Sequence, residues 1–84
     1  MFENQKTIYS VEKHYKEKNI IDRCGNIQKY ATYLIEKIKE GKSSAVYIGS
    51  LEAEMYELTK TFYELKFVNE KLQLIEKLEE ENNE

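Results

Sequence analysis

The sequence predicts an all-α fold: an antiparallel helical hairpin with an additional short helix at its N-terminal end and a long helix at its C-terminal end. Two observations support this prediction. The 84 residues include no proline and only three glycines, so few positions oppose helix formation. Apolar residues also recur at alternating intervals of three and four along two stretches, which indicates coiled-coil-like packing of the helices.

The N-terminal segment fits a short amphipathic helix of about three turns. In such a helix Ile8, Val11 and Tyr15 share one face. Residues 7–11 are also compatible with a strand, and in so short a run the spacing of apolar residues does not separate the two structures.

A second helix is expected to begin at Asn19, a suitable N-cap residue, and to end at Gly41, because glycine readily takes the left-handed conformation that ends many helices. Gly25 costs about 1 kcal/mol inside a helix, so a later start capped by Asn26 is an alternative. The apolar stripe of this helix comprises Ile20, Cys24, Ile27, Ala31, Leu34 and Ile38. A cysteine in such a stripe usually behaves as a small buried hydrophobe, and we expect this of Cys24.

The third and longest helix is expected to start near Ser44, although Ser50 offers a second start and residues 45–48 are compatible with a strand. Its first apolar stripe comprises Leu51, Met55, Leu58, Phe62 and Leu65. The apolar positions then continue as Val68, Leu72 and Ile75. Two consecutive steps of three rotate the stripe, so the C-terminal part of this helix is expected to face a second partner.

The chain is expected to form one helical domain over residues 1–84, with a frayed acidic tail at 79–84. One cysteine and one histidine exclude an internal disulfide and a conventional zinc site within one chain. The first residues do not form a secretory leader, and no apolar run reaches the roughly 18 residues of a membrane span. We expect a soluble cytoplasmic protein that does not bind membranes, and the abundance of Lys, Ile, Tyr and Asn suggests a bacterial or phage source.

We expect no enzymatic activity, no catalytic residues, no cofactor and no metal. The best contrary pattern is Glu54-x-x-Glu57 followed by Glu76-x-x-Glu79, which is similar to the acidic pairs of Mg²⁺-dependent all-α nucleotide pyrophosphohydrolases. Both pairs fall on one expected helix, roughly 30 Å apart, so solvated surface is the better interpretation and this enzyme the alternative. Nucleic-acid binding as an accessory protein is a second alternative, which the net charge of −3 and the single arginine disfavour.

The remaining function class is a non-enzymatic interaction protein of the regulator, inhibitor or adaptor type. We expect it to form a homodimer or a higher symmetric oligomer and to have a further protein partner, as yet unidentified. The long third helix should extend beyond the shorter second helix and leave apolar side chains uncovered. The candidate interaction residues are Val68, Leu72, Ile75 and Leu78 in this overhang, Asn69 as a polar residue that sets the register, and the tyrosines Tyr56 and Tyr63.

Overall fold

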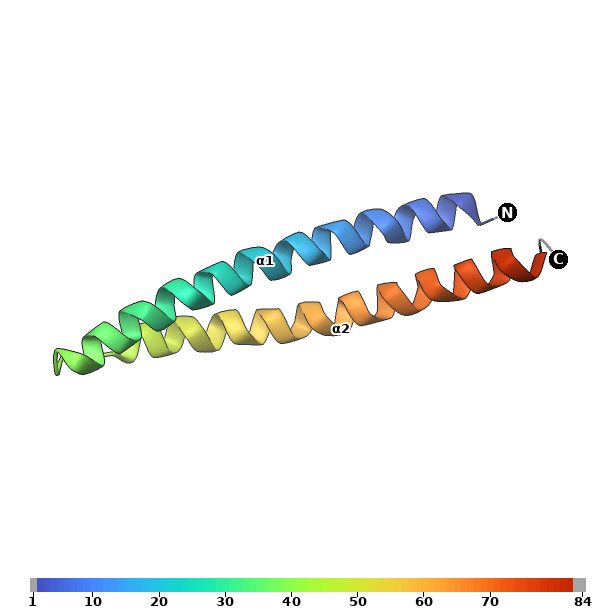
Figure 1. The fold of residues 1–84 in the computed structure, drawn as a ribbon. Helices are drawn as coiled ribbons and strands as arrows, with labels where there is room; N and C mark the ends of the chain where they lie inside the picture. Colours follow the sequence, from blue (N-terminus) through green and yellow to red (C-terminus); the bar gives the residue numbers. More distant parts are fainter. Residues whose placement is uncertain (1, 83–84) are drawn as a thin grey trace.

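The computed structural model describes residues 2–82 and consists of two long antiparallel α-helices joined by a short turn (Figure 1). Helix α1 spans Glu3–Lys39 and helix α2 spans Ala45–Asn82. The two helices lie side by side, so the start of α1 and the end of α2 share one end of a rod of 66 × 15 × 14 Å. The predicted all-α hairpin is confirmed, and the described residues contain no strand.

The prediction of a separate short N-terminal helix is wrong, because α1 continues without a break through both Asn19 and Gly25. Residues 7–11 belong to the same helix. A Cβ atom added at Gly25 would meet nothing within 4 Å, so this glycine lies on an open surface. Its cost of about 1 kcal/mol is small beside the packing of a long helix against α2, and the helix therefore continues through it.

Helix α1 ends as its local sequence predicts. Gly41 has a φ of +70°, in the left-handed region that glycine takes without strain. The N–H of Gly41 donates to the carbonyl of Ile38 at 3.1 Å, and the N–H of Lys42 donates to the carbonyl of Lys37 at 3.0 Å. These two bonds form a Schellman motif, which satisfies carbonyls that the helix end would otherwise leave without partners.

Helix α2 begins directly after Ser44. The carbonyl of Ser44 accepts hydrogen bonds from the N–H groups of Tyr47 and Ile48, both at 3.1 Å, so Ser44 stands at the N-cap position. The start predicted near Ser44 is therefore confirmed, and the alternative start at Ser50 is wrong. Residues 45–48 are helical rather than extended.

The two helices meet along one continuous seam of buried and half-buried residues. On each helix these residues recur at alternating steps of three and four, the heptad spacing of a coiled coil. On α1 the seam comprises Phe2, Lys6, Tyr9, Lys13, Lys16, Ile20, Arg23, Ile27, Tyr30, Leu34 and Lys37. On α2 it comprises Ser44, Tyr47, Leu51, Glu54, Leu58, Thr61, Leu65, Val68, Leu72, Ile75 and Glu79. The seam is rich in charged residues, and of the described residues only Thr61, Val68 and Ile75 are buried.

The seam of α2 corrects two predictions. The apolar stripe was expected to run through Met55 and Phe62 and to rotate after Leu65, but Glu54 and Thr61 occupy those seam positions and the heptad continues without rotation. The expected overhang of the long helix is also wrong, because α1 and α2 have 37 and 38 residues. The end of α2 is therefore covered by the start of α1.

At the open end of the hairpin, α2 remains helical through Asn82. Glu79 accepts a hydrogen bond from the ammonium of Lys6 at 3.2 Å, which joins the last turns of α2 to the first turns of α1. Of the acidic tail that we expected to fray, residues 79–82 are therefore helical, and residues 83–84 lie outside the described part of the chain. Among residues 2–82, neither helix is long and apolar enough to cross a membrane.

Candidate interaction surfaces

One side of the seam is lined by polar contacts between the helices. The guanidinium of Arg23 pairs with the Glu54 carboxylate at 3.1 Å, and the amide of Asn26 donates to the same carboxylate at 3.3 Å. Further along the rod, the ammonium of Lys16 pairs with the carboxylate of Glu64. Because each contact joins two specific positions, this row of polar groups sets the alignment of α1 against α2.

A polar pair that contains the buried Thr61 lies within the same row. The hydroxyl of Thr61 lies 3.0 Å from Oδ1 of Asn19 and 2.9 Å from the carbonyl of Glu57, and its single proton can be donated to either acceptor. A polar residue in a coiled-coil seam disfavours registers that would leave it without a partner. Sequence reasoning assigned this role to Asn69, which lies half-buried beside the seam. The missed signal was the position of Thr61, three residues after one seam leucine and four before the next.

The contact between Lys16 and Glu64 makes stability depend on pH. The hydrogen bond from Lys16 lowers the pKa of the Glu64 carboxyl below its ordinary value of 4.5. A carboxyl with a depressed pKa stabilises the fold above its unfolded pKa, and this contribution is lost as the pH falls through the lower folded pKa. We expect the Glu64 contribution to be complete above about pH 5 and to disappear on acidification, by a few tenths of a kcal/mol because both side chains are partly exposed.

Urea denaturation between about pH 3 and 6 tests this expectation by comparing the wild type with Glu64→Gln and Glu70→Gln. Glu70 is exposed on the same helix and serves as the control. The variant at Glu64 should lose less stability on acidification than the wild type, and the variant at Glu70 should follow the wild type. Equal acid sensitivity in all three proteins would contradict the assignment.

The other side of the seam is apolar near the turn. We name this surface the apolar flank. It comprises the flanking heptad positions Cys24, Ala31 and Ile38 of α1 and Ile48, Met55 and Phe62 of α2. Each residue follows a seam residue by four positions, and in an antiparallel pair these flanking positions of both helices lie on the same side. Ala31 is half-buried and the other five are exposed. The expectation that Cys24 is buried is wrong for the hairpin, where this thiol is exposed.

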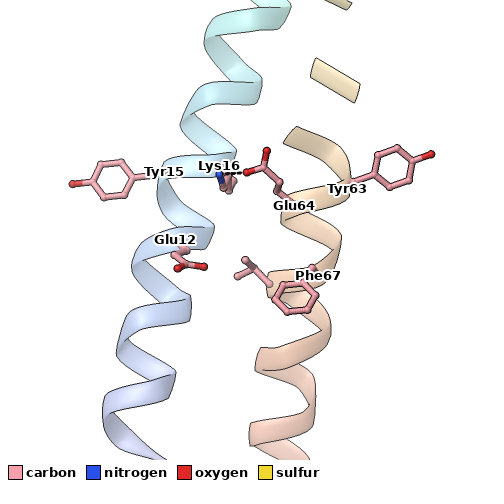
Figure 2. Close-up of a pocket in the computed structure, with 7 residues that line it drawn as sticks. Glu12, Tyr15, Lys16, Tyr63, Glu64 and Phe67 are labelled. Atoms are coloured by element: carbon pink, nitrogen blue, oxygen red, sulfur yellow. Dashed lines mark hydrogen bonds and ion pairs between the residues drawn. The ribbon is translucent and has the colours of Figure 1, made fainter. Parts of the chain in front are cut away.

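A third surface lies in the half of the rod near the chain ends. Figure 2 shows an open groove between the helices, crossed by the ion pair of Lys16 and Glu64. The rings of Tyr15 and Tyr63 point away from the groove on opposite sides. Val68 and Phe67 contribute apolar lining, but the groove has no side chains that close over it. Binding sites for small molecules usually enclose most of the ligand, and this groove does not.

The predicted interaction residues separate into two groups. Val68 and Ile75, with 2% and 6% of their surfaces exposed, are the core of the hairpin itself. Leu72, Leu78 and Asn69 are half-buried beside them. Tyr56 and Tyr63 lie exposed on the outer face of α2 and remain available to a partner. The apolar flank contains none of these residues.

The structure also locates the side chains considered for catalysis. Both glutamate pairs lie on α2, as predicted, and among residues 2–82 no three His, Cys, Asp or Glu side chains are grouped so that they could hold a metal. Glu54 is not a solvated surface residue, because it faces α1 and contacts Arg23 and Asn26. The exposed His14 ring packs edge-on against the ring of its neighbour Tyr15.

The fold and surfaces define a class of molecule: a two-helix coiled-coil hairpin with one polar and one apolar side. Comparisons with models of protein families, with curated proteins and with solved structures found no match.

Proposed function

We propose that this protein is non-enzymatic and acts as a regulator, inhibitor or adaptor by presenting helical faces to other proteins, including copies of itself. The observation that carries the proposal is the apolar flank. Ile38, Ile48, Met55 and Phe62 are exposed there, while only three of residues 2–82 are buried. Exposed apolar side chains gathered on one side of a small protein often mark a site where another protein binds.

The polar contacts on the opposite side of the seam support a structural role for Glu54, which belongs to one of the two glutamate pairs considered for metal binding. Both oxygens of the Glu54 carboxylate accept hydrogen bonds from α1. A metal ion at this carboxylate would have to displace Arg23 or share the site with its positive charge, which disfavours binding of a cation. Glu54 is therefore better explained as part of the seam than as a ligand of Mg²⁺.

Site-specific photocrosslinking in the cells that produce the protein tests the proposal. A photoreactive phenylalanine analogue in place of Phe62 should give a discrete protein adduct, because this position lies on the apolar flank. The same analogue in place of Lys77, which is exposed on the outer face of α2, is the control and should give none. Met55→Glu should weaken the adduct formed from position 62, because it places a charge within the same surface.

The absence of any protein adduct from position 62 would contradict the proposed function. Mg²⁺-dependent hydrolysis of a nucleoside triphosphate by the purified protein, lost in Glu57→Gln, would instead favour the enzymatic alternative. Glu57 is suitable for this measurement because, among residues 2–82, the ion pairs between the helices are formed by Glu54, Glu64 and Glu79, so the change at Glu57 should leave the hairpin folded.

A further inference from the structure

We infer that a second copy of this chain covers the apolar flank, so that two hairpins form a four-helix bundle with both turns at the same end and α1 of each copy beside α2 of the other. This inference rests on the proposed function and specifies its partner. It replaces the predicted association through the end of the long helix, whose residues Val68 and Ile75 are buried within the hairpin.

The direction in which the apolar stripe of each helix faces supports a four-helix arrangement. In an isolated hairpin, the apolar stripe of each helix should face the other helix. In a four-helix bundle each helix has two neighbours, and its apolar stripe faces between them towards the bundle axis. The apolar stripe of α1 is shared between seam residues and flank residues, namely Ile20, Ile27 and Leu34 in the seam and Cys24, Ala31 and Ile38 in the flank.

The apolar stripe of helix α2 is likewise divided between the seam and the apolar flank. Its stripe alternates between Leu51, Leu58 and Leu65 in the seam and Ile48, Met55 and Phe62 in the flank. The flank residues of both helices lie on one side of the hairpin, so both stripes face a position that a second pair of helices would fill. Each stripe in the sequence is therefore typical of a helix with two neighbouring helices. The hairpin supplies only one of these neighbours.

The hairpin exposes enough surface to form an interface with a second hairpin. Its accessible surface is 6625 Å². A compact monomer of 10.1 kDa would expose about 5,300 Å². The excess of about 1,300 Å² per chain exceeds the roughly 800 Å² that each partner buries in a stable interface of standard size. A second hairpin on the flank would remove much of this excess.

Charge determines how the second copy is oriented. Residues 1–42 carry nine basic and six acidic side chains, whereas residues 43–84 carry four basic and ten acidic ones. With the turns at the same end and the two-fold axis along the bundle, the basic α1 lies beside the acidic α2 of the other copy. With the turns at opposite ends, each α1 would lie beside the other α1 and repulsion would oppose association. Like-charged neighbours therefore disfavour the second arrangement.

The apolar flank is confined to the half of the rod near the turn. It covers residues 24–38 of α1, about 21 Å of helix. The equivalent positions towards the chain ends are polar, namely Ser10 and Glu17 on α1 and Asn69 and Glu76 on α2. Two copies with their turns at the same end superimpose their apolar halves, which is the arrangement that buries most apolar surface.

Light scattering on a sizing column tests the dimer with a matched pair of variants. Phe62 and Phe67 lie on the same helix and are 49% and 53% exposed, but only Phe62 belongs to the apolar flank. At tens of micromolar the wild type and Phe67→Glu should elute with twice the mass of the 10.1 kDa chain. Phe62→Glu should weaken dimerisation at least tenfold, because a charge would enter an apolar interface. A monomeric wild type, or equal loss of the dimer in both variants, would overturn the inference.

The thiol of Cys24 provides a second measurement on the unmodified protein. It is exposed in the hairpin but would face the interface between two copies. In the dimer its reaction with a thiol reagent should be at least about tenfold slower than in the urea-unfolded chain, and dilution below the dissociation constant should accelerate it. Equal rates in a protein that is dimeric by light scattering would exclude the apolar flank as the interface.

Energy transfer between two labels tests the orientation. A single cysteine at the exposed position Asn4, in a Cys24→Ser background, places one fluorophore at the open end of each copy. With the turns at the same end the labelled positions should be within about 20 Å, because neighbouring helices are 8–10 Å apart. With the turns at opposite ends they should be roughly 75 Å apart, and efficient transfer would not occur. The absence of transfer in a dimer would overturn the proposed orientation.

These results separate the inference from the proposed function. A monomeric purified protein that still gives a specific adduct with a different protein from position 62 would reject the dimer and retain the interaction function. A chain that is monomeric and gives no adduct from position 62 would reject both.

Discussion

Replacing Ile75 with alanine is expected to lower the free energy of unfolding by about 2–5 kcal/mol, because the change leaves a cavity at a buried position of the seam. Ile75 is only 6% exposed, whereas its neighbour Leu74 is 50% exposed. Leu74→Ala should therefore cost less than about 1 kcal/mol. A domain of this length has a total stability of roughly 4–13 kcal/mol, so the change at Ile75 is expected to remove a large part of it.

Urea denaturation followed by circular dichroism measures both changes. The protein concentration must be the same for each variant, because association stabilises the folded chain. Leu74 lies outside both the seam and the apolar flank and is a suitable control for the loss of apolar side-chain atoms. If the two variants were equally stable, the heptad register of α2 derived from burial would be wrong. The result also tests whether the end of α2 packs within its own chain.

Reversing one charge of the Arg23–Glu54 pair is expected to cost about 1–3 kcal/mol, and reversing both should recover most of that loss. The two side chains are 30% and 14% exposed, so the pair lies between a surface ion pair and a fully buried one. Glu54→Arg would leave two guanidinium groups facing each other, and Arg23→Glu would leave two carboxylates. The double variant restores opposite charges in the same seam positions.

A double-mutant cycle of the four proteins measures the coupling energy of the pair. Glu52→Arg is the control, because Glu52 is exposed on the same helix and lies outside the seam. This control should change stability by less than about 0.5 kcal/mol. Strictly additive effects of the two reversals would show that the contact contributes nothing to the alignment of the helices. The conclusion that Glu54 is a seam residue rather than a metal ligand would then lose its main support.

Structural elements that depend only on residues close together in the sequence could be predicted from the sequence. The absence of proline and the abundance of Glu, Lys and Leu predicted the helices, because these residues set the backbone preference locally. The end at Gly41 and the start at Ser44 were predicted for the same reason, since a helix end requires only a few residues with suitable conformations. Each predicted apolar stripe is divided in the structure between the seam and the apolar flank.

The tertiary structure decided which positions form the seam and how far α1 extends. Glu54 and Thr61 occupy seam positions because partners on the other helix, Arg23 and Asn19, satisfy their polar groups. Such partners lie 31 and 42 residues away, and no local pattern reveals them. Continuation through Gly25 likewise depends on support from α2. The sequence by itself determined the helices and their apolar surfaces, whereas the tertiary structure decided the seam, because a charged side chain can be buried only where another segment supplies its partner.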